Sequence, residues 1–346
     1  MGRFVRSAFA IPLWALLAAC ASNGGDASQR YSAVGRLSVF DASFEAIVAP
    51  DARIEKIAEG FTWSEGPAWL DKDNALLFTD VPANTLYRWS ERDGLTVLLK
   101  PSGYDGPGMD ALREAGANGL HAEPGGTVLL ADSGSRFVAR LDPSSKRKTP
   151  IATAYEGKRF NSPNDVVRRR DGVVFFTDPP YGLEGLDESP VKELAFSGVY
   201  RLDRDGRVHL LDDTLRFPNG IALSPDERTL YVANSDAGRP IWMAYSLDAD
   251  GAVTGKRVFA DASDLAGEDA PGLPDGMAVA ADGTLFATGP GGVIVFAPDG
   301  RRLGRIETGT AIANCAFGDD GRTLYMTSHS FLARVRVNAI GLGFPH

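Results

Sequence analysis

The chain has 346 residues, of which 44% are hydrophobic, with 39 glycines and 21 prolines. This composition excludes a disordered or fibrous protein, and the length suffices for a large buried core rich in turns. Its 36 basic and 45 acidic residues give a formal net charge of −9. That balance argues against nucleic acid as a partner, because phosphate binding requires clustered positive charge.

The amino terminus has the features of a bacterial secretory signal. Residues 1–19 carry two arginines, no acidic residue and an apolar run that is too short to cross a bilayer as a helix. The run ends in LAAC (17–20), which resembles the lipobox whose cysteine is lipidated. We therefore predict a lipoprotein signal peptide over residues 1–19 with lipidation at Cys20. The alternative is an ordinary signal peptide that is cleaved near a cysteine.

The segment after Cys20 is composed of small and polar residues. Residues 20–37 are predicted to be a flexible tether from the lipidated cysteine, and residues 38–346 to be one folded domain. Ala21 is not the aspartate that typically retains lipoproteins in the inner membrane. The sequence thus favours the outer membrane, facing the periplasm, with membrane contact only through the lipid. Cys315 is then left without a cysteine partner in the chain.

From residue 60 onward the sequence reads as all-β. Short alternating or β-branched runs lie between Asp-Gly, Pro-Asp and Gly-Gly turns. Six segments share one plan, in which a polar residue and a small or acidic residue precede two apolar strands joined by a polar turn. They begin at residues 65, 118, 164, 219, 275 and 314, about 50 residues apart on average. This period predicts a six-bladed β-propeller with four-stranded antiparallel blades around a central channel.

Two strands remain outside the six repeats. RIEKIA (53–58) precedes the first repeat, and FLARVRV (331–337) follows the last. We predict that they pair in one shared blade, because that pairing closes the ring and removes two free sheet edges.

The residue that opens each repeat is predicted to lie at the channel. The innermost strands of a propeller run along the central channel, so equivalent positions form a ring. Single Asn-Gly and Asp-Gly pairs are turn signals, but turn formation does not require six oxygen-bearing side chains in register. Oxygen ligands suit Ca²⁺, and two carboxylates would match its charge. The six residues are Glu65, Asn118, Asn164, Asn219, Asp275 and Asn314.

Several ordered motifs resemble the SMP-30/gluconolactonase family of six-bladed propellers. They include FTWSEGPAW (61–69), RFNSPNDVV (159–167), FPNGIALSPDERTLYVANS (217–235) and PDGMAVAADGTLFATGPGGVIVFAPDG (274–300). The resemblance covers about residues 38–338. It implies a hydrolase of lactones or organophosphorus esters that uses a divalent ion, usually calcium, with Mg²⁺, Mn²⁺ or Zn²⁺ as other candidates. The metal ligands that it implies, all members of the ring, are Glu65, Asn164, Asn219 and Asp275.

This resemblance leads to a mechanism for a lactone substrate. A lactone is an ester, so its hydrolysis requires a polarised carbonyl, an attacking water or carboxylate, and a stabilised oxyanion. Asp275 is the predicted catalytic residue, as the base that deprotonates water or as the nucleophile. Asn118 and Asn314 are predicted to orient substrate or water, with the alternative that their amides satisfy backbone groups.

The longest connections are predicted to form walls of a substrate site. Residues 101–117 and 179–197 carry Tyr104 and Tyr181, which we predict to contact substrate; packing within the loops is the alternative. Ser133 departs from the family pattern, because a histidine is common at its position. The sequence therefore does not establish that the substrate is the family's usual one.

Three functions therefore compete on the sequence alone. The leading one is a calcium-dependent, gluconolactonase-like hydrolase of sugar lactones or similar cyclic esters. The others are hydrolysis of organophosphorus or activated esters at the same metal site, and a non-catalytic calcium-stabilised propeller that binds a partner. We predict a monomer or weak dimer.

The run Arg168-Arg169-Arg170 is predicted to be a solvated hairpin tip.

Overall fold

The computed structural model describes residues 1–2, 30–267 and 269–345, and the predicted signal peptide and Cys20 lie outside these residues. The chain divides into two compact units, Met1–Tyr31 and Ser32–His346, and the second contains all the described strands. Within the described part of the chain, no helix is long and apolar enough to cross a membrane.

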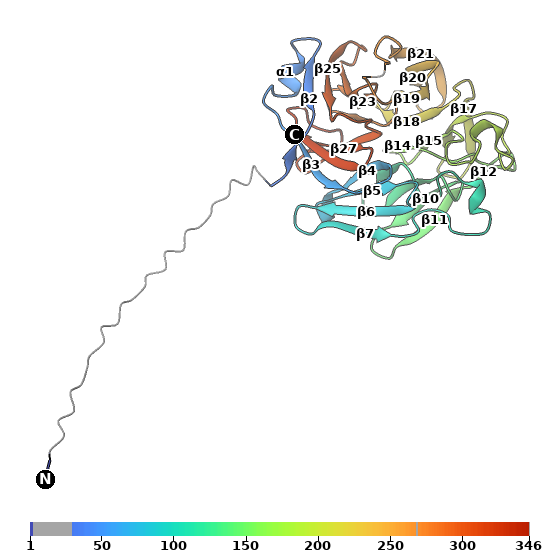
Figure 1. The fold of residues 1–346 in the computed structure, drawn as a ribbon. Helices are drawn as coiled ribbons and strands as arrows, with labels where there is room; N and C mark the ends of the chain where they lie inside the picture. The colour runs from blue at the N-terminus through green and yellow to red at the C-terminus, as the bar shows by residue number, and fades with distance from the viewer. Residues whose placement is uncertain (3–29, 268, 346) are drawn as a thin grey trace. The chain divides into compact units, whose positions relative to one another are not determined.

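Residues 32–345 confirm the predicted six-bladed propeller. Each blade is an antiparallel sheet, and its first strand lies nearer the middle in Figure 1 than its last, as β4, β14 and β18 show against β7, β17 and β21. The first two blades comprise β4 (Ser64–Leu70), β5 (Ala75–Asp80), β6 (Thr85–Ser90) and β7 (Gly94–Leu99), then β8 (Leu120–Ala122), β9 (Val128–Asp132), β10 (Phe137–Asp142) and β11 (Arg147–Ala152). The next two comprise β14 (Val166–Arg168), β15 (Val174–Asp178), β16 (Gly198–Leu202) and β17 (Val208–Asp212), then β18 (Pro218–Leu223), β19 (Thr229–Asp236), β20 (Arg239–Leu247) and β21 (Val253–Asp261). The last two contain β22 (Met277–Val279), β23 (Leu285–Gly289), β24 (Gly292–Phe296) and β25 (Arg302–Glu307), then β26 (Asn314–Gly318), β27 (Thr323–Ser328) and β28 (Phe331–Arg336).

Short elements occupy the connections. A two-stranded ribbon lies between the second and third blades, and each helical segment in the described residues is one turn long. These elements are β12 (Ala154–Tyr155), β13 (Lys158–Arg159), α1 (Phe44–Ile47) and the 3₁₀ turns η2 (Asp71–Asp73), η3 (Met109–Ala111) and η4 (Leu186–Glu188).

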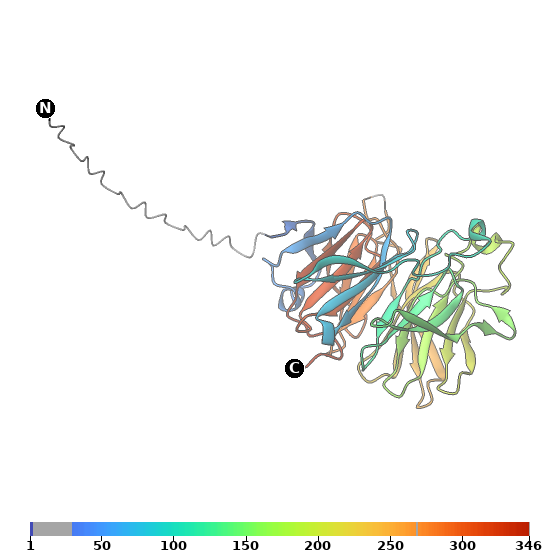
Figure 2. The same ribbon diagram turned by 90° about the horizontal axis from the view of Figure 1, so that it is seen from below.

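The amino-terminal strand β3 (Ile54–Glu59) completes the sixth blade. It pairs antiparallel with β28, with Glu59 opposite Phe331 and Ile54 opposite Val335. Figure 2 shows this blue segment beside the red carboxy-terminal strands. The predicted ring closure is therefore confirmed.

The folded domain begins earlier than predicted. Strand β1 (Ser32–Ala33) pairs with β3, and β2 (Arg36–Val39) pairs with β25, so residues 32–37 belong to the sheets and not to the tether. The reason is tertiary, because Leu37 packs against the buried core and the carboxylate of Glu307 accepts hydrogen bonds from Arg36 and Ser38. Strand β2 therefore covers the outer edge of β25.

The glycines that follow the ring residues permit close approach between neighbouring blades. At Gly66, where φ is +49°, a Cβ atom would lie 2.2 Å from the carbonyl oxygen of Asn118. At Gly220, a Cβ atom would lie 2.2 Å from the carbonyl oxygen of Asp275. These Asn-Gly and Glu-Gly pairs are thus points of inner-strand packing, for which a residue without Cβ is required.

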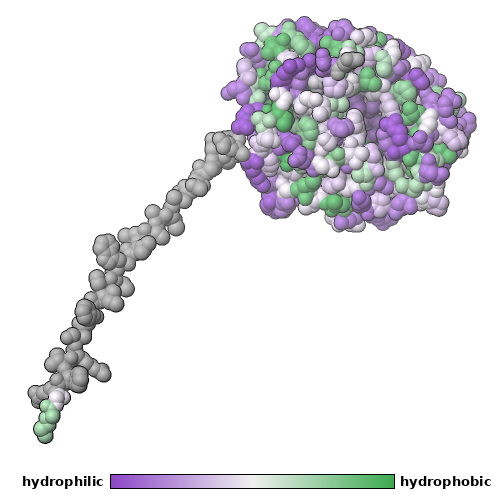
Figure 3. Space-filling view, viewed as in Figure 1, coloured by the Kyte–Doolittle hydropathy of each residue, from purple (hydrophilic) through white to green (hydrophobic). Residues whose placement is uncertain are grey.

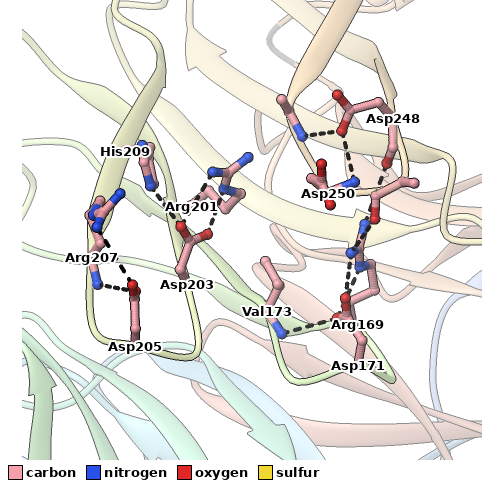
Figure 4. A network of polar contacts seen from close by, with 12 residues as sticks. Arg169, Asp171, Val173, Arg201, Asp203, Asp205, Arg207, His209, Asp248 and Asp250 are labelled. Atoms are coloured by element: carbon pink, nitrogen blue, oxygen red, sulfur yellow. Dashed lines mark hydrogen bonds and ion pairs between the residues drawn. The ribbon is translucent and has the colours of Figure 1, made fainter.

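The hairpin turns at the ends of the blades are held by aspartates (Figure 4). The carboxylate of Asp171 accepts the Val173 N–H at 3.1 Å, and that of Asp248 accepts the Asp250 N–H at 3.0 Å. Arg169 is only 7% exposed, because it pairs with Asp171 and donates to the carbonyl oxygen of Ala249 in the fourth blade at 2.7 Å. The prediction of a solvated tip is wrong for Arg169, which ties the third blade to the fourth.

The surface visible in Figure 3 intersperses polar and apolar side chains. The most exposed large apolar residues of the propeller lie on different elements, such as Val97 on β7, Val39 on β2 and Val258 on β21, which are 54%, 51% and 45% exposed. The predicted monomer or weak dimer stays a prediction.

Candidate functional site

The residues that open the six repeats come together where the inner strands begin. The strands β4, β8, β14, β18, β22 and β26 contact one another in turn around the axis. Contacts at their amino-terminal ends form a closed series: Gly66 against Asn118, Gly119 N–H to Asn164 O at 2.8 Å, Ile221 N–H to Asp165 Oδ2 at 3.1 Å, Gly220 against Asp275, Gly276 against Asn314, and the Asn314 amide to Glu65. The predicted ring therefore exists in the structure.

The strand pairing is irregular at Glu65 and Asn219, two of these residues. The register of β4 against β5 shifts between Glu65 and Ala68, and that of β18 against β19 shifts between Pro218 and Ile221. A bulge re-aims the side chains that it contains. A threonine on the second strand of the third blade also holds the backbone of a ring residue. Thr177 Oγ1 donates to the carbonyl oxygen of Asn219 at 2.7 Å.

Glu65 is a buried carboxylate held in one position. Its Oε2 accepts the Gly66 N–H at 2.9 Å, and the Asn314 side chain also donates to it. Burial, together with the negative charges of Asp165 and Glu114, raises the pKa of Glu65 to about 8. The carboxylate is thus held in one orientation, but its ionised form is unfavourable without a positive charge nearby.

Asp275 faces the same acids from the fifth blade. Its Oδ1 is buried and has no hydrogen-bond partner among the described residues. Burial, and then repulsion from Glu65, Asp165 and Glu114, raises the pKa of Asp275 well above its usual range. A buried carboxylate oxygen without a donor requires an explanation, and a bound cation supplies one.

Asn219 is oriented from the fourth blade. Its Nδ2 donates to Ser235 Oγ at 2.9 Å, and that hydroxyl donates to the carbonyl oxygen of Pro274, next to Asp275. This hydrogen bond engages the NH₂ group and leaves the amide oxygen to coordinate a cation. Amide and carboxylate oxygens are the ligands that Ca²⁺ and Mg²⁺ prefer.

The ring residues therefore fit a hard divalent cation. No group of three or more His, Cys, Asp or Glu side chains that could hold a metal ion is found in residues 30–267 and 269–345. The predicted ligands are instead two carboxylates and two amides, so a cation here would be coordinated by both carboxylate and amide oxygens. The four residues are Glu65, Asn164, Asn219 and Asp275.

Sequence reasoning missed Asp165, which precedes the first strand of the third blade and accepts the Ile221 N–H of the fourth blade. It is 7% exposed, its Oδ1 accepts the Val166 N–H at 2.8 Å, and burial raises its pKa to about 7. A signal was present in the aligned repeats, because four of them carry glycine at this position: Gly66, Gly119, Gly220 and Gly276.

The two predicted substrate-orienting amides have distinct surroundings. Asn314 Oδ1 accepts the Cys315 N–H at 2.8 Å, while its side chain donates to Glu65 and Asp165. Its amide thus positions two carboxylates. Asn118 is 4% exposed, and its carbonyl oxygen accepts Thr79 Oγ1 at 3.1 Å.

The two predicted tyrosines also differ. Tyr181 lies beside the ring, since its hydroxyl donates to the carbonyl oxygen of Ser235 at 3.2 Å and its pKa is raised by burial and by the charge of Asp275. Tyr104 instead donates to the carbonyl oxygen of Pro107 at 2.8 Å, within its own loop. Ser133, singled out from the sequence as a departure from the family pattern, donates to the carbonyl oxygen of Pro163 at 2.7 Å, next to Asn164.

Comparison with known proteins gives one consistent group of relatives. A family model described as the SMP-30/Gluconolactonase/LRE-like region matches residues 63–330. A gluconolactonase of Zymomonas mobilis is 43% identical over 314 residues, which is 90% of this chain and 88% of that protein. A solved gluconolactonase structure from Xanthomonas campestris has a TM-score of 0.75 at 32% identity and covers 88% of this chain and 97% of that one. A 6-deoxy-6-sulfogluconolactonase of Pseudomonas putida is 28% identical over 271 residues, 76% of this chain and 82% of that protein.

Proposed function

Because the chain belongs to the SMP-30/gluconolactonase family, we propose that it is a divalent-cation-dependent hydrolase that opens sugar lactones or similar cyclic esters. The gluconolactonase that is 43% identical along almost the full chain supports the reaction class. The observation that carries the proposal is the ring itself, in which the buried, unpartnered Oδ1 of Asp275 faces Glu65 and Asp165.

Four residues would hold the cation, which we propose to be Ca²⁺, with Mg²⁺, Mn²⁺ or Zn²⁺ as alternatives. They are Glu65, Asn164, Asn219 and Asp275. When bound, the cation supplies a Lewis acid for the lactone carbonyl and for the negative charge that develops on its oxygen. Its charge also offsets the mutual repulsion of the ring carboxylates.

Asp275 would carry the chemical step. Its Oδ1 makes no hydrogen bond to the described protein, so this oxygen could face both the cation and the substrate and accept a proton from an attacking water or attack the carbonyl directly. Glu65 is less suited to that role, since the Gly66 N–H and the Asn314 amide already engage it. Asp275 is essential in both routes.

The proposal is tested with purified protein after chelation of metal ions and after addition of Ca²⁺. We expect hydrolysis of D-glucono-1,5-lactone that is lost on chelation and restored by the cation. Turnover of a phosphotriester without turnover of aldonolactones or aromatic lactones would instead support the organophosphorus alternative. Firm cation binding with no hydrolysis of any ester would support the non-catalytic propeller.

We also propose that the enzyme is anchored to the outer membrane, facing the periplasm, through lipidated Cys20, which lies outside the described residues. Cys20→Ser is expected to abolish incorporation of an alkyne-labelled fatty acid and to release the protein into the soluble periplasmic fraction. Cys315→Ser is the matched control, because Cys315 is buried in β26 and only 3% exposed. Undiminished labelling of the Cys20→Ser protein would contradict the anchor.

A further inference from the structure

Two long loops meet beside the ring and hold each other in place. The backbone N–H groups of Arg113 and Glu114 both donate to the carbonyl oxygen of Gly182, at 3.0 and 3.3 Å. Leu112 and Leu183 form an isolated antiparallel bridge next to this contact. Residues 111–114 are thus fixed by their backbone against the loop that carries Tyr181.

Glu114 brings a fourth carboxylate to the ring. Its side chain is 12% exposed, and its Oε1 accepts Arg113 Nη2 at 2.9 Å. Arg113 is the only group in the described chain that hydrogen-bonds to this carboxylate. Glu114 lies close enough to Glu65 and Asp275 for its charge to oppose their ionisation. One carboxylate oxygen therefore remains for a ligand beside the site.

Arg113 connects this carboxylate to the ring through Tyr181. Its guanidinium lies 5.8 Å from the centre of the Tyr181 ring, which stacks on Phe217 at 5.2 Å. Tyr181 donates to Ser235, whose hydroxyl accepts the amide of Asn219. Arg113 and Glu114 are thus connected through Tyr181 to the metal-ligand positions, and the Arg113 side chain is 46% exposed.

This pair has the chemistry of a polyol site. The remaining carboxylate oxygen can accept hydrogen bonds from hydroxyl groups, and a guanidinium donates to hydroxyl or ring oxygens. The surroundings disfavour an anionic ligand. When ionised, the four carboxylates carry four negative charges, one more than the three positive charges of a divalent cation and Arg113. These carboxylates are Glu65, Asp165, Asp275 and Glu114. A site of this kind selects for hydroxyl groups and against an acidic substituent.

We propose that Glu114, supported by Arg113, determines specificity for uncharged polyhydroxylated lactones by binding their hydroxyl groups. This inference rests on the proposed lactonase function and adds a residue that determines its specificity. The backbone contacts to Gly182 hold the loop without the Glu114 side chain, so a change confined to that side chain separates recognition from loop structure.

The test compares Glu114→Gln with the wild type, both loaded with Ca²⁺. Gln retains the volume but removes the charge, so KM for D-glucono-1,5-lactone is expected to rise about tenfold with kcat nearly unchanged. KM for δ-valerolactone, which lacks hydroxyl groups, is expected to stay unchanged. Glu184→Gln, an exposed residue of the neighbouring loop, is the matched control and is expected to behave as wild type.

A second variant tests the exclusion of charge. Glu114→Lys is expected to increase kcat/KM for a lactone that bears a sulfonate or phosphate group by at least about tenfold relative to D-glucono-1,5-lactone. Thermal melting verifies that each variant is folded. Equal effects of Glu114→Gln on both lactones, or no effect on either, would overturn the inference.

Failure of the proposed function is distinguishable from failure of this inference. If the wild type hydrolyses no lactone, binding of the unreactive D-gluconolactam is measured by calorimetry. Weaker binding to Glu114→Gln than to Glu184→Gln would uphold polyol recognition without the reaction. Equal binding to the two variants, or no binding to the wild type, would overturn it.

Discussion

Replacing Asp275 by asparagine is expected to abolish lactone hydrolysis, with kcat reduced by about 10²–10⁴-fold. Asparagine retains an oxygen that can approach a cation, but it neither accepts a proton at neutral pH nor attacks a carbonyl. The change also removes one of the mutually repelling charges around Glu65, so the fold is expected to persist. Steady-state kinetics with D-glucono-1,5-lactone and thermal melting measure the two effects.

Cation binding distinguishes Asp275 from the other ring residues. Glu65→Gln and Asn219→Ala are expected to weaken Ca²⁺ binding, measured by calorimetry, more than Asp275→Asn does. Glu65 is held by the Gly66 N–H and Asn219 is oriented by Ser235, as expected of residues that position a ligand. A wild-type hydrolysis rate for Asp275→Asn would show that another group performs the chemistry.

The fold and the ring could be predicted from the sequence because both depend on a repeated local pattern. Alternating apolar runs and turn residues recur in each blade, and equivalent positions in equivalent blades must face the same axis. The pairing of β3 with β28 followed from two strands left over by the repeats. These inferences required no knowledge of contacts between particular side chains.

The missed features depend on contacts between distant segments. Arg169 looks like a turn residue, but it is buried because the hairpin of the next blade offers the carbonyl oxygen of Ala249. Glu114 looks like one residue of a polar insertion, and only the contact with Gly182 brings it beside Glu65. Asn314 occupies the predicted ring position, but its hydrogen-bond partners are set by Asp165 from another blade.

The cation-free protein is expected to lose thermal stability as the pH rises from about 5 to about 8. In the unfolded chain, Glu65 and Asp165 ionise at pH about 4, whereas in the folded chain their pKa values are about 8 and about 7. Between these values the folded state binds more protons than the unfolded state, so the free energy of unfolding falls as pH increases. Asp275 acts in the same direction.

Bound Ca²⁺ should reverse this dependence, because it favours the ionised carboxylates and competes with their protons. We expect the increase in Tm on adding Ca²⁺ to chelated protein to be larger at pH 8 than at pH 5.5, by about 5–10 °C. Calorimetric melting at both pH values, with and without the cation, measures this difference.

Asp178 provides an internal control for the origin of the pH dependence. Burial raises its pKa to about 7, but its carboxylate accepts the Asn161 and Ser162 N–H groups, both at 2.8 Å. It therefore contributes a pH dependence that Ca²⁺ should leave unchanged, whereas Asp165→Asn should reduce the part that Ca²⁺ reverses. If Tm fell equally with pH in the presence and absence of the cation, Glu65 and Asp275 would not be its ligands, since ligation must lower their pKa values.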